Sequence, residues 1–132
     1  MPFVTFTVRR GLSTVDKSHL SEAMIEAQMA AGFHRNDLFH RFLEVDQGDL
    51  RVDSRFPNYT TDRTDRFMVV EVMISKGRPP ETAAAIADEA VRQFSERLNL
   101  APQDILFIFQ EVEPHLPRFP AESISRKVTA DA

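Results

Sequence analysis

The sequence predicts an α/β (α+β) fold in which two β-α-β units form a four-stranded sheet with two helices on one face. Four short segments are apolar or alternate apolar with polar residues, two amphipathic helical segments separate them, and the two halves of the chain repeat each other. With 132 residues, 42% of them apolar, the chain suits one domain with a substantial core. We therefore expect a single domain, residues 1–132, with repeat units at about 2–46 and 66–113 and a tail at 114–132.

The first half contains one complete unit. Residues 3–8 alternate apolar residues with threonine, which indicates a strand. Ser13 is a helix N-cap residue, with Asp16 placed to close a capping box, and Gly32 suits a left-handed cap at the other end. Residues 38–45 read as a second strand. The helix is amphipathic because apolar residues recur at helical spacing, at Leu20, Ala23, Met24, Ala27 and Ala31.

The second half has the same order of elements. Residues 46–66 are a long polar connection, with a short strand expected near 50–52. Residues 67–74 are apolar on nearly both faces and predict a central strand. Pro80 suits the first turn of a helix, and residues 105–112 form the fourth strand. The stripe of this second helix is Ile86, Ala87, Ala90, Val91, Phe94 and Leu98.

A constant offset of 67 positions supports a duplication. It relates matching residues of the second strands and also the apolar positions of the helices, for example Asp37 with Asp104, Phe42 with Phe109, Glu44 with Glu111, and Ala23 with Ala90. Two such units side by side place both helices on one face of the sheet. The other face is then exposed and partly apolar, so we expect another subunit to cover it.

Composition excludes several classes of protein. The net charge is −4 and there is no basic stripe, so we expect no nucleic-acid partner. There are no cysteines, no glycine-rich phosphate loop and no ligand spacing among the four histidines, so we expect neither a metal nor a cofactor. No long apolar run or signal-peptide pattern is present, which predicts a cytoplasmic protein without a membrane span.

The candidate chemistry lies at the amino terminus and before the second helix. Once Met1 is removed, Pro2 is a secondary amine, and burial near Arg78 and Lys76 would lower its pKa toward neutrality. Such an amine moves protons well at neutral pH. Arg78 precedes a helix N-terminus, where an arginine fork and backbone N–H groups suit a carboxylate. Lys76 alternates with Arg78, although a solvated lysine is the simpler interpretation.

The remaining candidates are aromatic side chains and the tail. Phe39, Phe109 and Phe119 are predicted to wall a small apolar pocket. The tail from Pro114 shows no clear period and is either a loop that covers another part of the molecule or a frayed end.

The chain resembles the tautomerase superfamily, and within it the malonate semialdehyde decarboxylase-like branch, over roughly residues 2–113. The resemblance rests on Met1-Pro2 before a strand, Asn36-Asp37 before the second strand, Thr64-Asp65-Arg66 before the third, and Ser75-Lys76-Gly77-Arg78 before the second helix.

The resemblance implies roles for three positions and for the assembly. Pro2 is the catalytic amine, Arg78 binds the substrate carboxylate, and Asp37 assists water or proton chemistry. Homotrimers are usual in such proteins. Because Asp104 occupies the same turn in the repeat, Asp37 also has a purely structural interpretation.

Two departures from the family pattern concern the pocket. The decarboxylases often have an arginine where this chain has Lys76, and residues 115–119 lack their aromatic and glycine pattern. The dehalogenase branch fits less well, because the only tyrosine, Tyr59, lies in the linker.

Three functions follow as hypotheses. The first is a cofactor-independent enol–keto tautomerase of a small 2-oxo or enol carboxylate, with Pro2 as base and acid. The second is a 3-oxo acid decarboxylase or hydratase like malonate semialdehyde decarboxylase, with Pro2 protonated and Asp37 contributing. The third is a non-catalytic oligomer that binds a small acid.

Overall fold

The chain forms two consecutive β-α-β units, as the sequence predicts. The structure, a computed structural model, describes residues 1–121. The first unit consists of β1 (Phe3–Arg9), α1 (Thr14–Ala30) and β2 (His40–Val45), and the second of β3 (Met68–Ser75), α2 (Glu81–Leu98) and β4 (Ile105–Val112). Short 3-10 helices cover Gln47–Asp49 and Pro102–Asp104.

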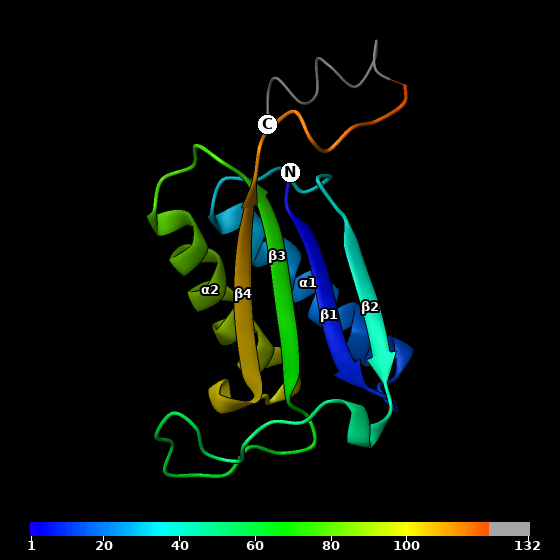
Figure 1. Cartoon of the computed structure of the whole chain (residues 1–132), viewed down its shortest axis with the longest axis vertical. Helices are drawn as coiled ribbons and strands as arrows, with labels where there is room; N and C mark the ends of the chain where they lie inside the picture. Colours follow the sequence, from blue (N-terminus) through cyan, green and yellow to red (C-terminus); the bar gives the residue numbers. More distant parts are fainter. Residues whose placement is uncertain (122–132) are drawn as a thin grey trace.

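The four strands form one sheet in the order β2-β1-β3-β4 (Figure 1). Strands pair in parallel within each unit, and β1 pairs with β3 in antiparallel orientation between the units. Both helices cover the same face of the sheet and pack against each other (Figure 1). The predicted fold is therefore confirmed.

The core lies between the sheet and the two helices. Val4, Phe6 and Val8 of β1 point toward the helices and are buried, as the alternation of the first strand predicts. The apolar stripes of the helices meet them, with Met24 and Phe94 fully buried. Phe6 stacks on Phe42 with ring centroids 4.6 Å apart and thereby joins β1 to β2. Among the described residues, no helix is both long and apolar enough to cross a membrane.

Helix boundaries follow the predicted capping residues. The Ser13 side chain accepts a hydrogen bond from the backbone N–H of Asp16 at 3.0 Å, which begins α1. Gly32 adopts the left-handed backbone (φ 98°) just after α1, as expected. Pro80 is the residue before α2 rather than a residue of its first turn.

The duplication contains a one-residue difference, which falls at the candidate site. The starts of the helices, Thr14 and Glu81, are 67 positions apart, whereas the left-handed glycines after the first strands, Gly11 and Gly77, are 66 apart. The second unit therefore has one extra residue between strand and helix, in the segment Arg78-Pro79-Pro80 that contains Arg78.

The linker between the units follows an irregular path below the sheet (Figure 1). The short strand expected near 50–52 was a wrong prediction, because the only regular structure there is the 3-10 helix before it. Arg9 of β1 donates to the backbone oxygens of Leu50 and Asp65. At the other end, the Asp104 carboxylate accepts from the backbone N–H and the hydroxyl of Thr64, at 2.7 and 2.6 Å.

Asp104 is only 2% exposed, so these two bonds satisfy a buried carboxylate. We predict that Asp104→Ala lowers the free energy of unfolding by about 2–4 kcal/mol, because it leaves the Thr64 donors unpaired. Urea denaturation measures this, with Asp88→Ala on the exposed side of α2 as the control. Equal stability of the two variants would show that Asp104 does not anchor the linker.

Candidate active site

The start of β1 and the loop after β3 enclose a cavity at one end of the sheet. It has a volume of about 370 Å³ and is lined by Met1, the turn from Ser75 to Pro79, and Pro114, Pro117 and Phe119 of the tail. Antiparallel pairing of β1 with β3 brings these segments together, because Phe3 lies opposite Met73. The described part of the tail therefore covers the cavity, and residues 122–132 lie outside the described residues.

An amine and a carboxylate meet beside this cavity. The Met1 amine lies 3.6 Å from Oδ2 of Asp37, and both side chains are largely buried, with 15% and 13% exposed. Burial lowers the pKa of the amine, Asp37 raises it, and the charge of Arg78 lowers it further, with a net decrease from the usual value. An amine at this position is therefore deprotonated more readily than the same amine in water.

Pro2 lies next to the Met1 amine at the start of β1. Its side chain is fully buried at the start of β1, between the paired strands β2 and β3. Three covalent bonds separate its nitrogen from the Met1 amine, so the two nitrogens lie roughly 3 Å apart. In the chain that retains Met1, however, the Pro2 nitrogen belongs to an amide and has no basicity.

Arg78 is held over an aromatic ring. It lies in the turn that the left-handed Gly77 begins, and its guanidinium carbon is 3.9 Å from the ring centroid of Phe33. Phe33 is 6% exposed and belongs to the loop after α1. This stacking restricts the orientation of the guanidinium plane.

Lys76 lines the cavity but already has an acidic partner. Its Nζ donates to Oε1 of Glu113 at 2.9 Å, and both side chains are about half exposed. A mobile surface pair of this kind is weak. Lys76 therefore adds positive charge at the rim less directly than Arg78 does.

The fold brings two of the three predicted wall residues together and places the third elsewhere. Phe119 lines the cavity, and the Phe39 ring lies 5.7 Å from it between centroids. Phe109 instead packs against the core and stacks on Phe107 at 6.0 Å. Its placement at the wall was wrong, because Phe109 lies on the side of β4 that faces α2.

Asp37 is held in place by a buried polar network that the sequence analysis missed. Gln28 of α1, only 2% exposed, donates to the backbone oxygen of Asp37 at 3.3 Å and contacts Nε2 of His40 at 2.9 Å. His40 in turn contacts the Ser21 hydroxyl at 2.7 Å. The available signal was Gln28 itself, a polar residue one helical turn from Met24 on the buried side of α1.

The loop after α1 thus contributes two parts of the candidate site. It carries Asp37 to the amine and Phe33 to Arg78. In the described part of the chain, no group of three His, Asp or Glu side chains is arranged to hold a metal ion. The chemistry that these residues can supply is proton transfer by an amine, with Asp37 and Arg78 influencing its charge.

Comparison with known proteins places the chain in a family. The family model described as tautomerase enzyme matches residues 37–115, more than half of the sequence, so the chain belongs to the tautomerase enzyme family. The match begins at Asp37 and does not include Pro2. No sequence among the curated proteins matches the chain.

Solved structures show the same fold at low sequence identity. A malonate semialdehyde decarboxylase is 18% identical, with a TM-score of 0.79 over 95% of this chain and 98% of that one. The FG41 malonate semialdehyde decarboxylase inhibited by 3-bromopropiolate is 15% identical, with a TM-score of 0.80 over 95% and 96%. A fused 4-OT symmetric trimer is 16% identical, with a TM-score of 0.71 over 89% and 91%.

The network around Asp37 should make stability depend on pH. Burial lowers the pKa of His40 to about 4, whereas the unfolded chain takes up this proton near 6.5. The native state is therefore destabilised as pH falls from about 6.5 to 4, by at most about 1.4 kcal/mol per pH unit. Urea denaturation across this range should show a shallower pH dependence for His40→Gln than for the wild type. Identical slopes would contradict a buried neutral histidine.

Proposed function

We propose that this protein is a cofactor-independent enol–keto tautomerase of a small 2-oxo or enol carboxylate, with Pro2 as the proton-transferring amine after removal of Met1. The observation that carries the proposal is the meeting of the amino terminus, Asp37 and Arg78 at one cavity. Removal of Met1 would free the Pro2 nitrogen at this position and also empty the part of the cavity that Met1 lines.

The electrostatics of the site favour the base form of the amine. Burial and Arg78 together outweigh Asp37 in setting the pKa of the terminal amine, which is lowered. A secondary amine at the same position would be affected in the same direction. Neutral Pro2 takes the hydroxyl proton of an enol, and the protonated proline returns it to carbon.

Arg78 is the proposed carboxylate anchor. A substrate carboxylate bound by the Arg78 guanidinium would lie in the cavity next to the amine. The enol carbons of the substrate would then be one or two bonds from that carboxylate. The Phe33 ring beneath Arg78 limits the orientations of the guanidinium, so less freedom is lost when substrate binds. Lys76 supplements this charge from the rim, and no cofactor is required.

We predict that the wild type ketonises phenylenolpyruvate and that Pro2→Ala reduces kcat by about 100-fold or more, because the substitution replaces the rigid secondary amine with a primary amine that rotates freely and is less well oriented toward the enol. Arg78→Gln should mainly raise KM, by about tenfold or more. Ultraviolet absorbance follows the reaction, and mass spectrometry establishes whether Met1 has been removed. Arg92→Gln serves as a control for the loss of one arginine.

Decarboxylation of a 3-oxo acid is the second candidate. Asp37 favours it, because a carboxylate 3.6 Å from the amine raises the pKa and stabilises the protonated form that polarises a carbonyl. Asp37→Asn distinguishes the two functions. Loss of decarboxylation with retained ketonisation would assign Asp37 to the second reaction. Ketonisation that is equally slow in the wild type and in Pro2→Ala would contradict the first function and favour the decarboxylase or a non-catalytic acid-binding protein.

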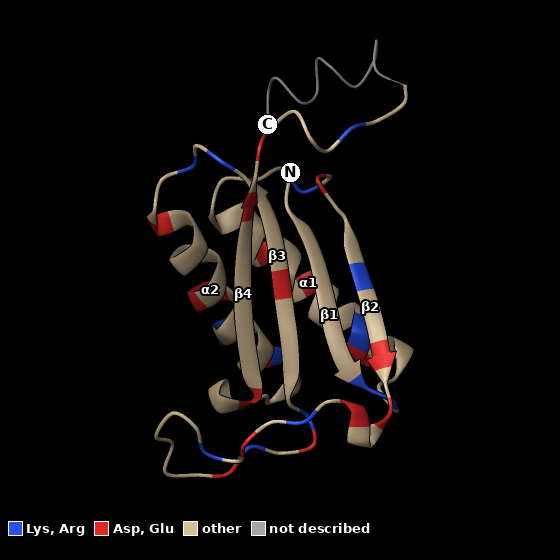
Figure 2. Cartoon of the chain, in the orientation of Figure 1, with Lys and Arg blue, Asp and Glu red and all other residues tan. Residues whose placement is uncertain are grey.

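We also propose that the protein is a cytoplasmic homotrimer. The sheet face opposite the helices exposes Leu43, Leu106 and Ile108, with 44%, 47% and 41% of each residue accessible. Figure 2 shows few charged residues along the four strands, whereas the linker is rich in both signs. One structure with the same fold is a symmetric trimer, which supports a trimeric assembly.

The double variant Leu106→Lys, Ile108→Lys should dissociate the assembly, because charged side chains cannot be buried there without partners. Light scattering after gel filtration should give three times 15.1 kDa for the wild type and a smaller mass for the variant. Val15→Lys on α1, an exposed apolar position on the helical side, is the control. A monomeric wild type would contradict the proposal.

A further inference from the structure

The duplicated fold has a second cavity at the opposite end of the sheet. The antiparallel pair of β1 and β3 relates the two units by an approximate two-fold axis. At one end of the sheet the start of β1 lies beside the end of β3, and at the other end the end of β1 lies beside the start of β3. A cavity of about 400 Å³ lies at this position, lined among others by Arg10, Gly11, Met68 and Leu100. It is the counterpart of the candidate active site in size and in place.

The two cavities share backbone geometry and positive charge. Gly11 corresponds to Gly77, with φ of 117° and 97°, and both glycines turn the chain toward a helix start. Arg10 precedes Gly11 as Lys76 precedes Gly77. Both basic side chains line their cavities.

Two further arginines at the second cavity are bonded only to neutral groups. Arg9 donates to the backbone oxygens of Leu50 and Asp65, and Arg66 to those of Leu98 and Asn99 at the end of α2. Among residues 1–121, neither arginine forms an ion pair with a carboxylate within 4.0 Å. Asp16 and Asp65 also line the cavity, and Arg10 is paired with Glu44 and Asp46, so Arg9 and Arg66 are the lining arginines without a carboxylate partner among residues 1–121.

The second cavity lacks the amine of the first. The counterpart of Asp37 is Asp104, whose two oxygens are occupied by the backbone N–H and hydroxyl of Thr64. The chain is continuous through Phe67 and Met68, so each backbone nitrogen there belongs to an amide and none is a free amine. The arrangement retains arginines that could bind an anion and lacks the terminal amine of the first cavity.

We propose that this cavity is a second, non-catalytic binding site for a small organic carboxylate. Arg66 and Arg9 supply the positive charge, and the anion balances guanidiniums that otherwise bond only to carbonyl oxygens. The full chain then has two carboxylate sites of different kinds, one at each end of the sheet. This inference is independent of whether the first site is catalytic.

Malonate titration followed by amide NMR of the whole protein tests the proposal. Two groups of signals should shift and saturate, one at Lys76–Arg78 and one at Gly11, Leu12 and Met68. Arg78→Gln should abolish the first response and leave the second. Arg66→Gln should weaken the second response at least about tenfold, as loss of a charge-assisted contact does, and leave the first intact. The intact first response also reports that this variant is folded.

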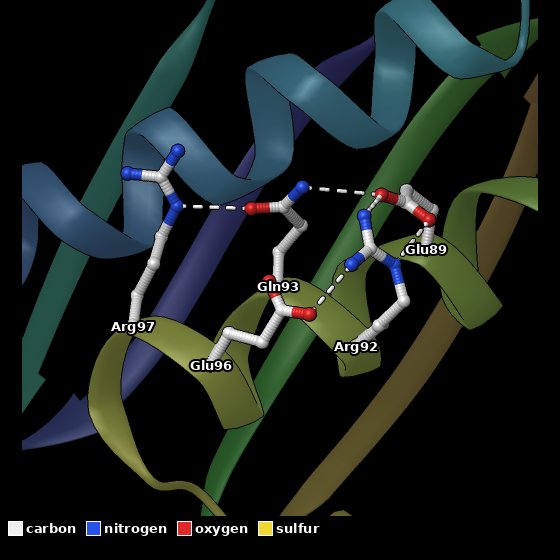
Figure 3. Close-up of polar contacts among 5 residues, drawn as sticks. All are labelled: Glu89, Arg92, Gln93, Glu96 and Arg97. Carbon is white, nitrogen blue, oxygen red and sulfur yellow. Dashed lines mark hydrogen bonds and ion pairs between the residues drawn. The ribbon is translucent and has the colours of Figure 1, made fainter.

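Arg92→Gln is the matched control for Arg66→Gln. Arg92 lies on α2 but pairs with Glu89 and Glu96 on the helix surface (Figure 3), and it does not line the cavity. Its replacement should change neither response. Absence of a saturable shift at Gly11, Leu12 and Met68 in the wild type would overturn the proposal, as would a second response that Arg66→Gln leaves unchanged.

Discussion

The insertion of β1 into the middle of the sheet is the constraint on which the site depends. A chain terminus at a sheet edge would be exposed, whereas β1 pairs with β2 on one side and with β3 on the other. Its first residues are therefore fixed by two ladders of backbone hydrogen bonds and covered by the tail. This burial removes water from the terminal amine and is the largest cause of its lowered pKa.

The loop between α1 and β2 places two functional side chains around the buried amine. Asp37 and Phe33 come from this one loop, so the carboxylate that raises the amine pKa and the ring that supports the opposing Arg78 are positioned together. Gln28 connects the loop to α1 from below through a buried amide. A small change in the helix position would therefore alter both charges at the amine, and the buried polar network limits such changes.

The sequence was sufficient for the fold because its signals were local and repeated. Alternation in residues 3–8, the Ser13 cap and the 67-residue offset each specify an element, and duplication then determines how the units pair. The same reasoning located Arg78 before a helix and Pro2 before a strand. It also failed where tertiary contacts decide: Phe109 packs under α2, and residues 50–52 have no neighbouring strand to pair with.

Other parts of the candidate site could not be predicted from the sequence, because they depend on contacts between distant residues. Stacking of Phe33 on Arg78 joins residues from different units, and the Gln28–His40 contact joins a helix to a strand. Neither contact leaves a periodic pattern. The extra residue before α2 could be recognised only after the glycines and helix starts of the two units were aligned in space.

The central claim is that Pro2 is a free, buried amine with a lowered pKa, and ¹⁵N NMR titration of proline-labelled protein tests it directly. Only an N-terminal proline nitrogen titrates, because the other prolines are amides. The account predicts one titrating signal with a pKa below about 8 that moves upward in Arg78→Gln, since that substitution removes a cation beside the amine. Absence of a titrating proline nitrogen, or a pKa at or above about 8 that Arg78→Gln leaves unchanged, would contradict it.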